Sequence, residues 1–122
     1  MIRVSPEEFE ALVQKALDSL PEEFAELLDN VAVMVEESPS DDDLAEVGMS
    51  PDERDELFGL YQGVSLLERD SFYSSLPDRV VVFRRPILVN CRSRREAVRE
   101  IRDTVIHELG HYFGMDEDQM PY

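Results

Sequence analysis

The sequence predicts an α+β fold in which a small mixed sheet is packed with helices. Three observations predict it: amphipathic helices with capping residues, two valine-rich runs typical of strands, and proline, glycine and serine between these segments. The 122 residues have room for one hydrophobic core, so residues 1–122 are predicted to form a single domain. Hydrophobic residues make up 43% of the chain, which argues against general disorder.

The beginning of the chain predicts two helices and a strand. Ser5, Pro6 and Glu8 combine an N-cap, a first-turn proline and a capping-box glutamate, so a helix is expected to begin there. A short second helix follows Pro21, and residues 31–35 are expected to form a buried strand. The apolar stripe of the first helix comprises Phe9, Leu12, Val13, Ala16 and Leu20.

The middle of the chain is less regular. Residues 36–49 are polar and acidic and are expected to form a loop. Ser50 repeats the capping pattern and opens a helical turn that ends near Gly59. Residues 57–64 are expected to form an edge strand, and residues 65–76 a loop.

The second clear strand is predicted at residues 79–83, which are again rich in valine. Pro86 is expected to interrupt regular secondary structure after this strand, because proline lacks a backbone donor and restricts the residue before it. Residues 87–89 are then expected to form a short helix or strand.

A long helix is predicted at the end of the chain. Ser93 and Glu96 form an S-x-x-E capping box, so this helix is expected to begin at Arg94. At about 100° per residue, His107 and His111 point roughly away from the apolar stripe. That stripe comprises Val98, Ile101, Val105, Leu109 and Tyr112.

The motif that carries chemistry is H-E-x-x-H at residues 107–111, which uses both histidines of the chain. Two histidines four residues apart lie one turn apart on a helix, so both imidazoles can point at one ion. Glu108 lies where a carboxylate can take a proton from water bound at that ion. This pattern indicates one Zn²⁺ per chain, with His107 and His111 as metal ligands and Glu108 as the catalytic residue.

Zinc in a catalytic site needs a third protein ligand and an open position. Gly114 favours a sharp turn after the helix, and three carboxylates follow at Asp116, Glu117 and Asp118. In H-E-x-x-H-x-x-G-x-x-Z the ligand position is Glu117, which is therefore the predicted third ligand. Asp116 and Asp118 remain alternatives.

The segments HELGHYFGMDED, LFGLYQGVSLLER and LPDRVVVFRRPIL resemble the small bacterial single-domain zincin-like metallopeptidases, also called mini-zincins. The resemblance covers most of residues 57–118 and implies a zincin-like single domain with one zinc held by two histidines and one aspartate. The pattern of that family, HExxHxxGxxD, is matched at His107, Glu108, His111 and Gly114, whereas Glu117 stands at the aspartate position. It also implies that a peptide pairs with an edge strand, for which residues 57–64 are the candidate. A proline at Leu60 would test a donor on that strand.

The predicted function is zinc-dependent hydrolysis of peptide bonds through a zinc-activated water, with Glu108 as general base. Tyr61, Tyr112 and Tyr122 are candidates for auxiliary donors, although core packing suits at least two of them. Two alternatives remain: a catalytically inactive zincin-like scaffold that binds a partner, and a binding domain that uses the metal only to fasten the C-terminus.

Charge narrows the classes of partner. The net charge of −16 argues against nucleic acid, and no apolar run has the length of a membrane helix. Residues 79–102 contrast with the rest, because they carry eight arginines against Glu96 and Glu100. Pairing of these arginines within the molecule is one interpretation. A surface that binds an acidic partner or a substrate carboxylate is the other.

Fewer sequence features bear on the cellular location and the oligomeric state. The first residues lack a signal pattern and the single cysteine, Cys91, is expected to serve packing, so the predicted compartment is the cytoplasm. The expected partner is a peptide or protein substrate. A homodimer is compatible with the sequence, which does not determine the oligomeric state.

Overall fold

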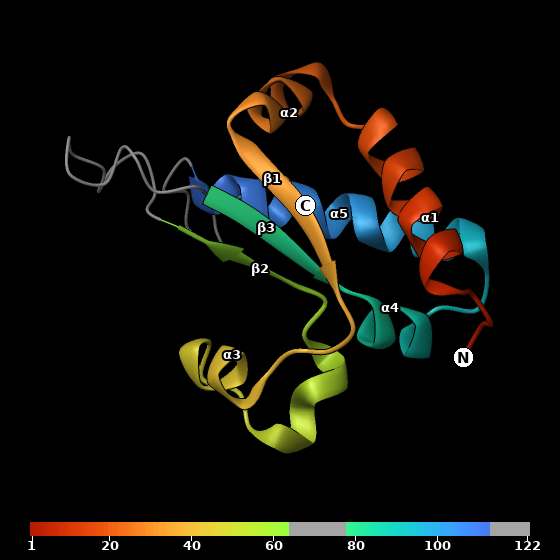
Figure 1. Ribbon diagram of the computed structural model, residues 1–122, viewed down its shortest axis with the longest axis vertical. Helices are drawn as coiled ribbons and strands as arrows, with labels where there is room; N and C mark the ends of the chain where they lie inside the picture. Colours follow the sequence, from red (N-terminus) through yellow and green to blue (C-terminus); the bar gives the residue numbers. More distant parts are fainter. Residues whose placement is uncertain (64–77, 113–122) are drawn as a thin grey trace.

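A three-stranded mixed sheet forms the centre of the fold in the computed structural model, which describes residues 1–63 and 78–112. The strand order is β1-β3-β2, so β3 (Asp78–Phe83) is central. β1 (Val31–Glu36) runs parallel to β3, and β2 (Gly59–Gln62) runs antiparallel to it. Helices lie behind the sheet, to its side and beyond its ends, as Figure 1 shows, and the predicted α+β fold with a small mixed sheet is confirmed.

The N-terminal helix α1 (Pro6–Asp18) begins where its capping residues predict. The Ser5 hydroxyl accepts a hydrogen bond from the Glu8 N–H at 3.1 Å, and the Glu8 carboxylate accepts one from the Ser5 N–H at 2.9 Å. Phe9, Val13 and Ala16 form its buried face. Two short helical segments follow, α2 (Glu22–Ala25) and the 3₁₀ turn η1 (Glu26–Asp29).

The strand β1 lies at the edge of the sheet, whereas the sequence predicted that it would be buried. Its residues alternate between buried or half-buried and exposed, and the Met34 side chain is 43% exposed. An edge strand of a small sheet has one face on the core and one toward solvent, whatever its hydrophobicity. The most buried strand is β3, in which residues 80–83 are 0% exposed and only Arg79 is half-buried.

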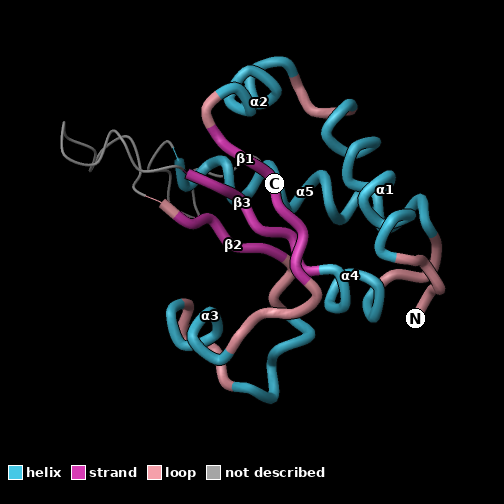
Figure 2. Tube along the Cα trace, in the orientation of Figure 1, coloured by secondary structure: helices cyan, strands magenta, loops and turns pink. Residues whose placement is uncertain are grey.

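Residues 36–49 contain a helix, α3 (Asp41–Glu46), which corrects the prediction of a loop. Its capping box joins Ser40 and Asp43, and Leu44 is buried. The predicted turn after Ser50 is present as the 3₁₀ segment η2 (Pro51–Glu56). Figure 2 shows α3 beyond one end of the sheet and α2 beyond the other.

The strand β3 leads directly into a short helix, α4 (Arg84–Asn90). Pro86 occupies the third position of this helix, so it does not interrupt the secondary structure as the sequence predicted. The first turn of a helix has no partner for its N–H groups, and proline therefore costs little there. The loop predicted at residues 65–76 lies outside the described residues.

The longest helix, α5 (Arg94–Tyr112), begins at Arg94 as predicted. The Ser93 hydroxyl accepts from the Glu96 N–H at 3.1 Å, while the Glu96 carboxylate accepts from the Arg92 N–H rather than from Ser93. The helix contacts α1, α4, β2 and β3. Of the predicted stripe, Ile101, Val105 and Leu109 are fully buried and Val98 is half-buried, whereas the Tyr112 side chain lies outside the described residues. Ala97 and Ile106 are also fully buried, so the buried face is wider than predicted.

Candidate metal centre

The two histidines and the glutamate of the motif meet near the C-terminal end of α5. One ligand atom from each of His107, Glu108 and His111 can be chosen so that all three lie within 4.8 Å of one another. The imidazole centroids are 5.4 Å apart and their planes are inclined by 51°. All three residues are half-buried, so they are enclosed by protein and still accessible. This geometry is compatible with a single metal ion between two imidazoles.

The environment of the buried ring nitrogen of His111 tests whether these residues fit a metal ion. Its Nε2 atom is buried and has no hydrogen-bond partner among the described residues. A buried polar atom without a partner is unfavourable, by about 1–3 kcal/mol, and is therefore rare unless a ligand or water satisfies it. Two imidazoles are ligands that zinc prefers, and the neighbouring Glu108 carboxylate can accept a proton from water bound at the ion. The described residues therefore fit a zinc ion.

A main-chain donor on the sheet fixes the glutamate. The Tyr61 N–H in β2 donates a hydrogen bond to Glu108 Oε1 at 2.9 Å. The Phe83 N–H donates to the Phe58 carbonyl, and in an antiparallel pair the residues that exchange hydrogen bonds alternate. Residues 58, 60 and 62 therefore point their N–H groups at β3. Those of Gly59 and Tyr61 point away from β3.

Gly59 packs closely against the helix α5. A Cβ atom added to Gly59 would lie 2.5 Å from Thr104 Cγ2 and 2.9 Å from the Val81 carbonyl oxygen. It would also lie 3.8 Å from Glu108 Cγ. Only a glycine allows β2 to pack this tightly against α5, which brings the Tyr61 N–H within reach of Glu108.

A hollow of about 280 Å³ opens beside the motif. It lies between the segment that leads into β2 and the face of α5 that carries His107 and Glu108. Glu56 and Asp103 add carboxylates to its wall. The motif therefore borders a concave surface on the side of β2, where a substrate can approach. The lining residues are Glu56, Leu57, Phe58, Gly59, Asp103, Thr104, His107 and Glu108.

Sequence reasoning proposed this strand for the substrate but missed its hydrogen bond to Glu108. Tyr61 was a candidate for its phenol, but its side chain packs against the main core and its backbone N–H contacts Glu108. A glycine inside a strand pattern is a signal of close backbone approach, and Gly59 carried that signal. Glu117, its alternatives Asp116 and Asp118, and Tyr122 lie outside the described residues.

The comparison with known families agrees with the fold. A family model described as zincin-like metallopeptidase matches residues 28–122. The chain therefore belongs to the family of zincin-like metallopeptidases. No curated protein matches the chain. Within residues 1–63 and 78–112, no helix combines the length and the apolar composition that crossing a membrane requires.

Proposed function

We propose that the chain is a zinc peptidase that hydrolyses peptide bonds. His107 and His111 are two of the metal ligands, Glu108 is the general base, and Glu117 is the third protein ligand. The observation that carries the proposal is the His111 Nε2 atom, which is buried without a hydrogen-bond partner among the described residues, in a group with His107 and Glu108. Membership in a family of metallopeptidases supports the same chemistry.

The zinc would lower the pKa of water in the site and polarise the carbonyl group of the substrate. The other contributions come from the chain. The Tyr61 N–H holds Glu108 Oε1, which orients the carboxylate beside the two imidazoles. From there Glu108 takes a proton from the attacking water and delivers it to the nitrogen of the leaving amine. The hollow beside β2 provides space for the substrate.

The substrate is a peptide that lies along the outer edge of β2. Among the described strands β2 pairs only with β3. On its other edge the Tyr61 N–H already donates to Glu108, so the main-chain groups left for an added strand include those of Gly59. Gly59 points its N–H and carbonyl toward that edge. The Leu60 N–H points to β3, so Leu60, which the sequence suggested as a test position, is the wrong residue for testing substrate contacts.

The domain includes residues 1–27, which precede the part that the family model matches. Phe9, Val13 and Ala16 of α1 belong to the same core cluster as Ile101 and Val105 of α5. Without α1, these two fully buried residues of the catalytic helix would lose part of their cover. A single domain over residues 1–122 is therefore the arrangement that the packing favours.

The deciding experiment compares the parent protein with Glu108→Gln, both purified without added metal and without a metal-binding tag. Elemental analysis is expected to find one zinc per chain in both proteins. Hydrolysis of a casein-derived peptide mixture should fall by about 10²–10⁴-fold in the variant, which cannot act as a base. Glutamine retains an oxygen that can accept from Tyr61, so the fold is kept.

Each other outcome contradicts a defined part of the proposal. Zinc without any hydrolysis by the parent would indicate an inactive scaffold or a domain in which the metal is structural. Hydrolysis that survives in the variant would remove Glu108 from the mechanism. A parent protein without zinc, which also fails to bind it on addition, would show that the described residues do not form a metal site.

A further inference from the structure

A groove rich in cations runs between α1 and α5. It consists of two adjoining concavities of about 570 Å³ and about 310 Å³, which share Arg95 and Val98 in their walls. We call it the α1–α5 groove. Its lining residues are Leu12, Lys15, Ser19, Arg94, Arg95, Val98, Arg99 and Arg102. Five of these eight are cationic and none is acidic, although the chain as a whole carries a net charge of −16.

Ion pairs within the molecule account for some of these cations. Arg94 pairs with Glu8 at 3.0 Å, and Arg102 pairs with Asp103 at 3.3 Å. Arginines elsewhere are paired in the same way, Arg84 with Glu37 and Arg85 with Asp55, so pairing within the molecule is the rule for many of the chain's arginines.

Lys15, Arg95 and Arg99 do not follow this rule. All three are exposed, and none makes an ion pair with a described residue. Lys15 is the single lysine of the sequence. Three such cations lining one groove repel one another, and an anionic ligand would relieve that repulsion.

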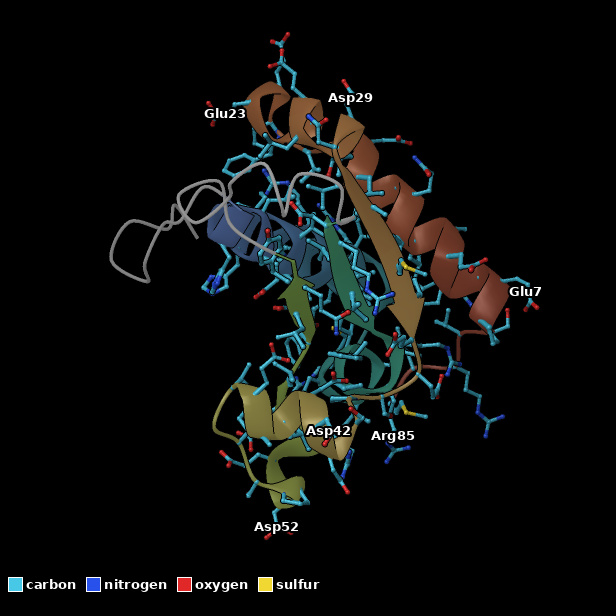
Figure 3. All side chains as sticks on the ribbon, turned by 60° about the vertical axis from the view of Figure 1, so that its left-hand side comes forward. Glu7, Glu23, Asp29, Asp42, Asp52 and Arg85 are labelled. Carbon is cyan, nitrogen blue, oxygen red and sulfur yellow. The ribbon has the colours of Figure 1, made fainter. Side chains whose placement is uncertain are left out.

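The exposed surface elsewhere on the molecule is acidic. Figure 3 shows Glu7, Glu23, Asp29, Asp42 and Asp52 directed outward from α1, α2, η1, α3 and η2. All five are exposed. The α1–α5 groove is thus a positive region on an otherwise negative molecule. A long polyanion such as nucleic acid would be repelled by the rest of the surface, whereas a short acidic segment would touch only the groove.

We propose that the α1–α5 groove binds an acidic peptide segment that also carries apolar side chains. Leu12 and Val98 are half-buried and give the groove an apolar floor, which suits leucine-type side chains better than phosphates or sugars. Guanidinium groups bind carboxylates through two parallel hydrogen bonds, so Arg95 and Arg99 provide specific contacts for glutamate or aspartate side chains.

The groove is separate from the metal centre on α5. Arg95 and His107 are twelve residues apart, as are Arg99 and His111. A helix turns by about 120° beyond three full turns over that distance, so the groove and the metal centre occupy different sides of α5. The proposal therefore does not depend on the proposed peptidase activity. A peptide can occupy the groove with the metal site empty or filled.

The test measures binding by fluorescence anisotropy at low salt, with a fluorescein-labelled peptide built of repeated Glu-Glu-Leu triplets. The protein carries Glu108→Gln in all samples, so that the probe is not hydrolysed. The double variant Arg95→Gln with Arg99→Gln is expected to raise the Kd about tenfold, because each lost charge contact weakens binding severalfold. The matched control is Arg92→Gln, which removes an exposed arginine that does not line the groove.

The comparison of probes tests the class of ligand. A peptide of Glu-Glu-Ser triplets should bind more weakly than the Glu-Glu-Leu peptide. A peptide of Lys-Lys-Leu triplets can bind only to the acidic surface outside the groove, so the double variant should not weaken its binding. The inference is overturned if the Glu-Glu-Leu peptide does not bind, or if the double variant and the Arg92→Gln control bind it equally. It is also overturned if a labelled single-stranded oligonucleotide binds more tightly than the acidic peptide.

Discussion

The Tyr61 backbone N–H lies 2.9 Å from Glu108 Oε1, although 47 positions separate these two residues in the sequence. The hydrogen bond joins the edge strand β2 to the helix that carries both histidines. It holds the carboxylate of the proposed base by a main-chain group, which side-chain motion cannot displace. The strand that would pair with a substrate peptide is thus also the strand that orients the base.

This hydrogen bond predicts the behaviour of Glu108→Asp. Aspartate keeps the negative charge but is one methylene shorter, so its carboxylate cannot hold the same position and still accept from Tyr61. We expect zinc content to be unchanged and turnover of a peptide substrate to fall by about 10–100-fold, a smaller loss than in Glu108→Gln. Turnover equal to that of the parent would show that the position of the carboxylate is not important.

The close approach at Gly59 predicts the effect of Gly59→Ala. The added methyl group would meet Thr104 Cγ2 and the main-chain carbonyl of Val81, and the carbonyl cannot move without distorting the sheet. Overpacking of this kind costs about 1–3 kcal/mol in the free energy of unfolding, which urea denaturation measures. Because β2 would move away from α5, turnover should fall as well.

Two controls separate the steric effect of Gly59→Ala from other causes. Gly48→Ala meets no atom within 4 Å, so its cost reflects only the backbone φ of +76° at that position. Thr104→Ser in the Gly59→Ala background removes Cγ2 and should restore part of the lost stability. If the serine restores nothing, the contact with Thr104 is not the cause.

The parts of the fold that the sequence predicted are those that local patterns determine. The capping residues of α1 and α5 and the spacing of His107 and His111 depend on a few neighbouring positions. The helix α3 was missed because its sequence DDDLAE contains only two apolar residues, Leu44 and Ala45. Its support is partly non-local: the Arg54 side chain, on η2, forms an ion pair with Asp41.

The features that the sequence did not reveal depend on contacts between segments that are distant in the chain. The all-apolar run of β1 does not reveal that this strand lies at an edge, because strand order is decided by pairing with β3, which begins 47 residues after β1 does. The contact between Tyr61 and Glu108 has no local signature either. Sequence patterns predicted the chemical groups of the candidate site, whereas the contact of β2 with one of them required the tertiary structure.

The buried Nε2 atom of His111, which has no hydrogen-bond partner among the described residues, predicts how zinc affects stability. Zinc should raise the melting temperature of the metal-free protein, since a ligand that binds only the folded state adds about 2.7 kcal/mol at a concentration 100 times its Kd. His107→Ala and His111→Ala should abolish this increase. Magnesium at the same concentration is the control, because it prefers oxygen ligands. An unchanged zinc effect in either variant would place the site elsewhere.

The buried thiol of Cys91 predicts a loss of stability in alkali. Burial, with the carboxylates of Glu96 and Glu100, raises the pKa of Cys91 from 9.0 to about 11, against the opposing effect of Arg99. Between these values the unfolded chain has lost the thiol proton and the folded chain retains it. The free energy of unfolding should therefore fall by about 1.4 kcal/mol per pH unit in this window and be unaffected by this group below it.

Chemical denaturation of the parent and of Cys91→Ala across this window isolates the contribution of the thiol, because all other groups titrate in both proteins. The difference in unfolding free energy between the two should shrink as the pH rises from 9.0 to about 11. A constant difference would mean that the thiol ionises equally in the folded and unfolded states.

The third metal ligand is predicted from spacing alone, because Asp116, Glu117 and Asp118 lie outside the described residues. Glu117 stands where the H-E-x-x-H-x-x-G-x-x-Z pattern places a ligand, and glutamate binds zinc through the same carboxylate group as aspartate. Glu117→Gln should therefore weaken zinc binding strongly, as a competition with a chelator of known affinity would measure. Asp116→Asn and Asp118→Asn are matched controls, since each also removes one charge from the same segment.

The pattern of zinc loss across these three variants identifies the ligand. Equal weakening in all three would indicate a general electrostatic effect, and a selective loss in one of the aspartate variants would assign the ligand to that aspartate. Glu117→Asp adds a further comparison, because it restores the residue of the family pattern and should retain zinc at least as well as the parent.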